Sequence, residues 1–246
     1  MELIDERGRL FGRVNVVDAL VVLLVVAVVA AGVALVAGGA GGGIETTAEE
    51  TSRVVTVELG SHPDRVATLV EPGNVTFAGE DATITDVYRS PTADGVLLVA
   101  AVRVDGQRTT GGFEVGRTPL RYGTEPHLES TNYRLKGRVV SVGNQTTVET
   151  RQLAATMEAN VSTAVADAVT AGDERRIAGE TVATVESVET VERGDGWRVV
   201  RVDLSLLTRP TAEGFTYGGR AVRIGTHLDF ETMRYRFRGR VVMTEP

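Results

Sequence analysis

Two closely similar stretches decide the fold: "RYGTEPHLESTNYRLKGRVV" runs from Arg121 to Val140, and "RIGTHLDFETMRYRFRGRVV" runs from Arg223 to Val242. They align without a gap. Fainter similarity continues upstream, where "AGEDATITDV" from Ala78 matches "AGETVATVESV" from Ala178. The sequence therefore predicts two copies of one β-rich module, at residues 53–143 and 144–246.

Hydrophobic residues in both copies recur mainly with period two, which is typical of β-strands. Leu228 and Phe230 share one strand face, whereas Tyr235 and Phe237 have the opposite parity, so a turn or bulge is predicted near Glu231. Further strands are predicted at "VVTVEL", "DATITDV", "GVLLVAAVRV" and "WRVVRVDLSL". The repeated glycines are predicted to lie where the chain turns; they are Gly123, Gly137, Gly225 and Gly239.

Helical signals are few. The segments "DRVATLVEPG" and "AVADAVTAGD" each predict a short helix closed by a glycine. A longer helix is predicted only in the second copy, from residues that recur at helical spacing; these are Leu153, Met157, Val161, Ala164, Val165 and Ala168. The predicted fold class is α+β, dominated by antiparallel strands, with one short helix in each module and an N-terminal transmembrane helix.

That transmembrane helix is predicted at residues 19–37, within a run that carries no charge between Asp18 and Glu45. Its length is enough to cross a hydrocarbon core of ~30 Å. A cleaved signal peptide is the alternative. The leader at residues 1–18 contains arginines, whereas no basic residue follows the helix before Arg53, which predicts a single-pass location in the cell membrane with a cytoplasmic N-terminus and the body outside. Residues 38–52 are predicted to be a flexible tether.

Composition excludes several kinds of chemistry. The chain has no cysteine, so disulfides, thiol catalysis and cysteine-based zinc sites are excluded. The net charge is only -7, and the body is nearly balanced, so nucleic acid is not an expected partner. The three histidines lack ligand-like spacing, and no nucleophile stands beside a base in a recognisable motif. We therefore expect neither a metal nor another cofactor, and no enzymatic activity.

The leader and the closing blocks together resemble a known family. The leader contains Gly12-Arg13-Val14-Asn15 followed by Asp18, and closing blocks begin at Leu120 and again at Val222. In these features the chain resembles the uncharacterised family called domain of unknown function 4330, with the closing block duplicated. The resemblance implies one membrane helix and a β-rich domain outside the cell, and no functional residue can be transferred from it.

Two sets of residues are candidate sites. Basic side chains recur on one face of each closing strand and could contact anionic lipids, acidic glycans or carboxylates of a partner; they are Arg134, Lys136 and Arg138 in the first copy, and Arg234, Arg236, Arg238 and Arg240 in the second. The simpler interpretation is a solvated strand face paired with acids on the neighbouring strand. Three asparagines lie in glycosylation sequons; they are Asn74, Asn144 and Asn160.

The expected function follows from the anchor, the repeats and the missing catalytic motifs. We expect a membrane-anchored, extracytoplasmic binding or scaffolding protein of the cell envelope. The expected partners are the lipid bilayer and a membrane or envelope protein. An accessory subunit of a transport or secretion complex is one alternative, and a hydrolase acting on envelope polymers is another.

Overall fold

The computed structural model describes residues 9–10, 14–15 and 49–245. Near the N-terminus, β1 (Arg9–Leu10) pairs antiparallel with β2 (Val14–Asn15). No helix within the described ranges is long and apolar enough to cross a membrane. The expected transmembrane helix at 19–37 lies outside those ranges, and so does most of the leader. The predicted single-pass membrane location is corrected, because the described structure offers no candidate span.

Residues 49–245 lie in one compact unit that begins at Glu49. Its first module contains β3 (Glu49–His62), α2 (Asp64–Ala67), β4 (Gly73–Phe77), β5 (Glu80–Thr92), β6 (Gly95–Thr109), β7 (Gly112–Val115), β8 (Thr118–Leu120), β9 (His127–Ser130), β10 (Tyr133–Lys136) and β11 (Arg138–Gly143). The strand order is β10-β9-β4-β5-β6-β3-β11. The two end strands, β10 and β11, are consecutive in the chain and are separated only by Gly137. Because β9 pairs with β4 as well as with β10, the sheet closes on itself.

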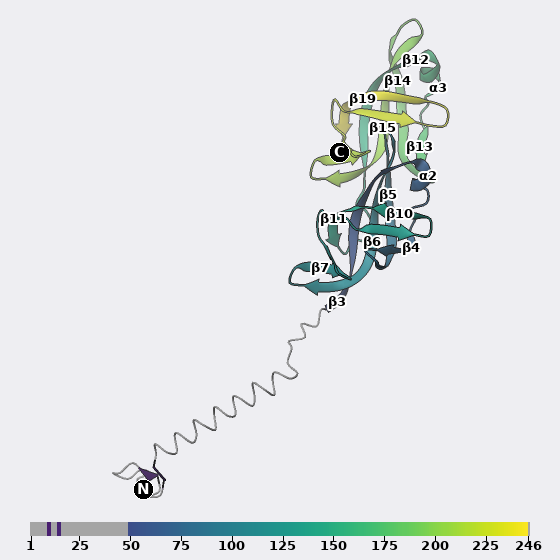
Figure 1. Ribbon diagram of the computed structural model, residues 1–246. Helices are drawn as coiled ribbons and strands as arrows, with labels where there is room; N and C mark the ends of the chain where they lie inside the picture. The colour runs from purple at the N-terminus through teal and green to yellow at the C-terminus, as the bar shows by residue number, and fades with distance from the viewer. Residues whose placement is uncertain (1–8, 11–13, 16–48, 246) are drawn as a thin grey trace. The chain divides into compact units, whose positions relative to one another are not determined.

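The second module repeats this order of elements (Figure 1). It contains β12 (Arg151–Ser162), α3 (Thr163–Ala168), β13 (Glu174–Ile177), β14 (Glu180–Arg193), β15 (Trp197–Thr211), β16 (Gly214–Tyr217), β17 (Arg220–Ala221), β18 (His227–Glu231) and β19 (Arg236–Glu245). The strand order is β13-β14-β15-β12-β19-β18, so β13 and β18 are the two end strands. Side chains link these ends: Arg175 lies 3.2 Å from Glu231, and Arg234 and Tyr235 both contact Asp173.

The nearly all-β architecture corrects the predicted α+β class. The only helices in the described part of the chain are α2, with 4 residues, and α3, with 6. The longer predicted helix is wrong over its first part, because Leu153, Met157 and Val161 lie on one face of β12. Its last part is confirmed, since Ala164, Val165 and Ala168 lie in α3. A spacing of four residues fits both the helical period and an even number of strand residues, so these positions could not distinguish the two. The predicted tether also ends early, because residues 49–52 pair with β6.

The duplicated blocks encode the same backbone arrangement twice. In the first module Gly123 donates its N–H to the carbonyl of Val139, whose own N–H donates to Thr124. Gly225, Val241 and Thr226 form the same two bonds in the second. The repeated Gly-Thr segment is therefore a turn that is fixed to the closing strand, as predicted for Gly123 and Gly225.

Gly137 and Gly239 are conserved between the copies for a different reason from the predicted turn. Neither has a positive φ. A Cβ on Gly137 would lie 2.3 Å from Cγ1 of Val57, and one on Gly239 would lie 2.9 Å from Sδ of Met157. These glycines let the closing strand approach the first long strand of its module.

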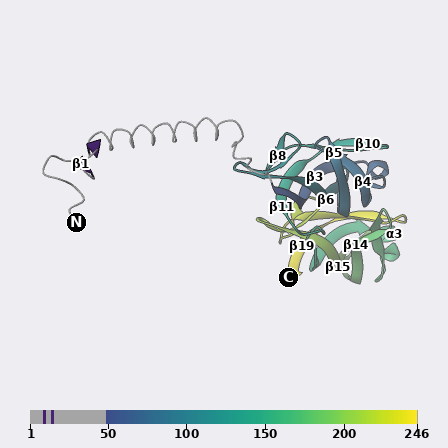
Figure 2. The ribbon, with the colours of Figure 1, turned by 90° about the horizontal axis from the view of Figure 1, so that it is seen from below.

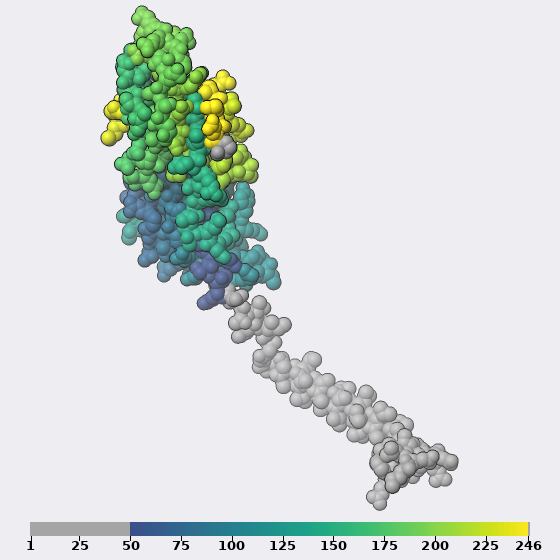
Figure 3. Space-filling view, turned by 180° about the vertical axis from the view of Figure 1, so that it is seen from behind, coloured from purple at the N-terminus to yellow at the C-terminus, as the bar shows by residue number. Residues whose placement is uncertain are grey.

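The two modules pack directly against each other, and they appear as adjacent groups of strands in Figures 1 and 2 and as one continuous surface in Figure 3. Ile177 and Val182 of the second module belong to the core of the first. The end of the β5–β6 hairpin contacts the β15–β16 hairpin and the residue after it: the Tyr88 hydroxyl donates to the carbonyls of Leu207 and Thr216, and the Ser90 hydroxyl accepts from the N–H of Gly218. This interface fixes the position of the candidate site described next.

Candidate functional site

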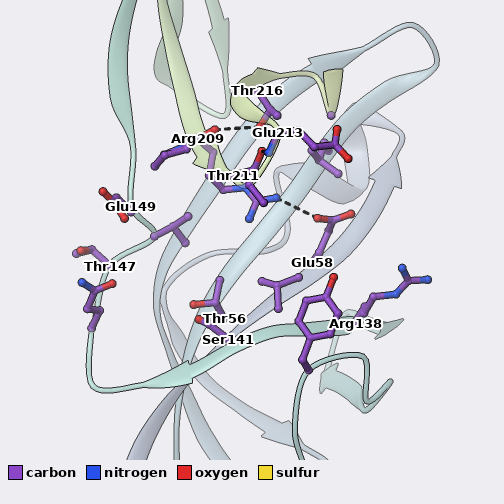
Figure 4. A pocket seen from close by; sticks show the side chains of 18 residues that line it. Thr56, Glu58, Arg138, Ser141, Thr147, Glu149, Arg209, Thr211, Glu213 and Thr216 are labelled. Carbon is purple, nitrogen blue, oxygen red and sulfur yellow. Dashed lines mark hydrogen bonds and ion pairs between the residues drawn. The ribbon is translucent and has the colours of Figure 1, made fainter. Parts of the chain in front are cut away.

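A cleft of about 670 Å³ opens where the two modules meet, and we call it the junction cleft (Figure 4). Its volume lies within the range of ~300–1,000 Å³ that is usual for small-molecule sites. The first module contributes β3 and β11, the second contributes the β15–β16 hairpin, and residues 144–150 connect them. The polar and aromatic side chains that line it include Thr56, Glu58, Tyr122, Arg138, Ser141, Gln145, Thr147, Glu149, Arg209, Thr211 and Glu213.

An ion pair between the modules lies at the wall of the junction cleft. Arg209 of β15 contacts Glu58 of β3 through Nη2 and Oε2 at 3.1 Å, as the dashed line in Figure 4 shows. The Arg209 side chain is only 16% exposed, and its Nε has no hydrogen-bond partner within the described structure. The Thr216 hydroxyl donates to the Arg209 carbonyl at 3.0 Å. These contacts hold the guanidinium of one module against the carboxylate of the other.

The connecting segment forms a second wall and is itself fixed. Asp86 accepts a hydrogen bond from the N–H of Val148 at 2.8 Å, and the Thr85 hydroxyl donates to the Thr146 carbonyl at 2.6 Å. Val148 is buried between the modules. Thr147 and Glu149 therefore project on the opposite side of the opening from Glu58 (Figure 4).

Tyr122 provides an aromatic surface at the junction cleft. The residue is 79% exposed although the Gly-Thr turn that follows it is held by backbone hydrogen bonds. The equivalent residue in the second module is Ile224, which is exposed too but does not line the junction cleft. The turn fixes the backbone beside Tyr122, and the exposed ring is available for stacking.

Several uncharged polar side chains line the cleft. They include Thr56, Ser141, Gln145 and Thr147. Hydroxyl and amide groups of this kind both donate and accept hydrogen bonds. Nowhere in the described part of the chain do three or more His, Asp or Glu side chains gather in a way that could hold a metal ion. The arrangement is chemically suited to hydrogen bonding with a polar ligand.

The structure places the predicted basic residues of the first copy in ion pairs. Arg134 lies 3.0 Å from Glu129, Lys136 lies 2.6 Å from Glu125, and Arg138 lies 3.7 Å from Glu125. The hydrogen bond from Lys136 and its charge hold the pKa of Glu125 below its usual value. Arg138 is the member of this set that lines the junction cleft.

The predicted basic residues of the second copy are less fully paired. Arg234 contacts Asp173. Within the described structure, no carboxylate lies within 4.0 Å of Arg236, Arg238 or Arg240, although Glu231 and Asp229 lie opposite the first two on β18. The three sequon residues Asn74, Asn144 and Asn160 are all exposed, and Asn144 accepts a hydrogen bond from Arg53 at 2.8 Å.

Sequence reasoning missed most of the junction cleft. Arg138 was among the predicted contact residues, but Glu58, Tyr122 and Arg209 were not. The one usable signal was the substitution of Tyr122 by Ile224 within otherwise matching turns. The ion pair could not be anticipated, because it depends on how the two modules pack.

Fold and site together define an internally duplicated, almost entirely β protein with a polar cleft between its two modules. The model of the family named domain of unknown function (DUF4330) matches residues 1–96. The match confirms the predicted resemblance for the leader, residues 19–37 and the strands up to the start of β6. No curated protein and no solved structure matches the chain.

Proposed function

We propose that the protein is a binding or scaffolding module that holds a polar ligand in the junction cleft. The observation that carries this proposal is the construction of the cleft from both modules around the Glu58–Arg209 pair. A site whose walls are fixed before binding loses little conformational entropy when a ligand enters. The fixed connecting segment and the shared core supply that preorganisation.

Binding is a better fit to this geometry than hydrolysis. A hydrolase of polymers needs one carboxyl group that can donate a proton and another that can attack or activate water. Glu58 is engaged by Arg209, and Glu149 lies 3.5 Å from Arg151. Two of the three lining carboxylates therefore position neighbouring groups, and Glu213 alone does not supply the pair that hydrolysis needs, so we expect no turnover of the bound ligand.

The proposal can be tested by NMR on the isotopically labelled protein with a panel of amino acids, short peptides, oligosaccharides and nucleotides. We expect at least one class to shift the amides of Thr56, Ser141 and Thr147 while leaving β18 and β19 unchanged. The double variant Glu58→Gln/Arg209→Gln should weaken those shifts. A panel without any hit, or hits confined to other surfaces, would show that the junction cleft is not a binding site.

A further inference from the structure

The geometry of the junction cleft points to a neutral oligosaccharide as its ligand, an inference that rests on the function proposed above. Three features of the cleft carry it: the balance of its charges, its uncharged donors and acceptors, and the exposed ring of Tyr122. Each feature excludes a different class of ligand, and a saccharide chain satisfies all three.

The charges lining the junction cleft largely neutralise one another. Glu58 pairs with Arg209, Glu149 with Arg151, and Arg138 with Glu125. Of the charged lining residues, only Glu213 has no oppositely charged partner within 4.0 Å in the described structure. The charged lining residues are three carboxylates and two arginines, so an anionic ligand such as a nucleotide or an acidic peptide would meet a small excess of negative charge. Charge of this size and mixed sign gives no strong field to hold a charged ligand, which favours an uncharged one.

The uncharged groups match the surface of a sugar. Neighbouring sugar hydroxyls donate and accept at the same time, and the planar amide of Gln145 can both donate to and accept from two of them. Thr56, Ser141 and Thr147 add further hydroxyls at the floor and wall. An apolar ligand would remove these groups from water without giving them hydrogen-bond partners, which disfavours its binding.

Tyr122 supplies the remaining element. The C–H bonds on one face of a pyranose ring form an apolar patch, and a flat aromatic ring covers that patch while its hydroxyl stays in water. Tyr122 is the aromatic side chain that lines the junction cleft, and it is 79% exposed. The second module carries Ile224 on the same turn, away from the cleft, where no such role is needed.

The test uses the full chain and three neutral hexasaccharides as probes: cellohexaose, chitohexaose and mannohexaose. Saturation-transfer NMR identifies the bound sugar, and calorimetry measures its affinity. Tyr122→Ile installs the residue of the second module, while Ile224→Tyr is the matched control at the equivalent exposed position. We expect one hexasaccharide to bind, with about tenfold loss of affinity in Tyr122→Ile and no change in Ile224→Tyr. Raising NaCl from ~0.1 M to ~1 M should leave the affinity unchanged, because no ion pair is formed with the ligand.

The saccharide inference is overturned if none of the three sugars binds, or if Tyr122→Ile binds as tightly as the unaltered protein. An affinity that falls steeply with salt would also overturn it, since that behaviour indicates a charged ligand. These outcomes differ from failure of the proposed function. If peptides or nucleotides shift the amides of the junction cleft while sugars do not, the cleft remains a binding site and only the ligand class is wrong.

Discussion

The guanidinium of Arg89 contacts the carboxylate of Glu180 at 3.0 Å and thereby joins the two modules. The Arg89 side chain is only 4% exposed, and it also donates to the carbonyls of Ala67 and Val70 behind α2. A buried arginine is tolerated because its donors are satisfied by carbonyls and a carboxylate. The Arg89 side chain therefore connects α2 and the residues after it, the β5–β6 hairpin and the first residue of β14.

Replacement of Arg89 by Met should destabilise the fold. The variant keeps the aliphatic volume but leaves two buried carbonyls without donors, at a cost of about 2–4 kcal/mol in the free energy of unfolding. Glu180→Gln is the control, since Glu180 is 50% exposed and its loss of charge should cost less than about 1 kcal/mol. Urea denaturation measures both. Equal effects of the two variants would show that the ion pair, and not the carbonyl contacts, stabilises this junction.

Alanine at the repeated closing-strand glycines should be poorly tolerated. In Gly137→Ala the new methyl group overlaps the rigid Cγ1 of Val57, so we expect a loss of about 2–3 kcal/mol in stability. Gly239→Ala should cost less, because the thioether of Met157 can move aside and the rigid neighbour, the carbonyl oxygen of Glu158, would lie 3.0 Å from the new Cβ rather than at 2.3 Å as in Gly137→Ala. Gly143→Ala is the control, as nothing lies within 4 Å of its Cβ and its φ is not positive. Thermal unfolding that ranks Gly143→Ala as the worst of the three would contradict the close-approach explanation.

A single substitution in the β13–β14 turn should stabilise the protein. Ala178 and Gly179 form a two-residue hairpin loop in which both φ angles are positive, at 49° and 85°. This is the type I′ geometry that favours Asn-Gly, because asparagine tolerates the left-handed conformation better than alanine. We expect Ala178→Asn to raise the free energy of unfolding by about 0.5–1 kcal/mol in calorimetry. Ala178→Val, which is β-branched, should lower it at the same position.

The contacts of Asp173 should make stability depend on pH. Burial alone would raise the pKa of Asp173, but hydrogen bonds from Tyr235 and the N–H of Thr170, together with Arg234, outweigh it and hold the pKa below 3.8. A carboxyl with a lowered folded pKa stabilises the protein above its unfolded pKa, and this contribution is lost as the pH falls through the folded value. Tyr235→Phe should therefore flatten the loss of stability below about pH 4.

At alkaline pH the same contact makes stability fall as the pH rises. Burial and the hydrogen bond to Asp173 raise the pKa of Tyr235 above 10.0. Stability from Tyr235 is then complete below pH 10.0 and declines as the pH rises from there toward the folded pKa. Measuring the free energy of unfolding of the Tyr235→Phe variant between about pH 2 and pH 11 checks both the acid and the alkaline dependence. A profile identical to that of the unaltered protein would exclude this pair as a titrating contact.

The strands were predictable because their signal is local. The period-two segments near Val54, Asp81, Gly95 and Trp197 all lie in strands of the structure. The turn predicted near Glu231 is confirmed, since β18 ends at that residue. The helix predicted from Leu153 was wrong because its spacing fits a strand equally well. The segment forms a strand because it pairs with β15 on one side and with β19 on the other, and a local sequence pattern does not reveal such partners.

Most of the candidate site could not be predicted from the sequence, because its residues are distant in the chain. Glu58 and Arg209 belong to different modules, and their meeting depends on the insertion of Tyr88 and Ser90 against β16. The basic residues of the closing strands were visible, yet their pairing with Glu125 and Glu129 requires the register of β9 and β10. Arg138 was found because it belongs to a repeated pattern, and its place in the junction cleft comes only from packing.

In the Gly-Thr turns, the atoms that stabilise the fold are different from the side chain that is exposed to a ligand. Backbone atoms of Gly123, Thr124 and Val139 make the fixing bonds, so the preceding side chain at Tyr122 contributes nothing to them. The same holds for Ile224. Each copy thus offers one position where selection can vary chemistry freely at almost no structural penalty. After duplication, one position could acquire specificity while its twin drifted, and a laboratory library randomised at both would explore new recognition on an unchanged scaffold.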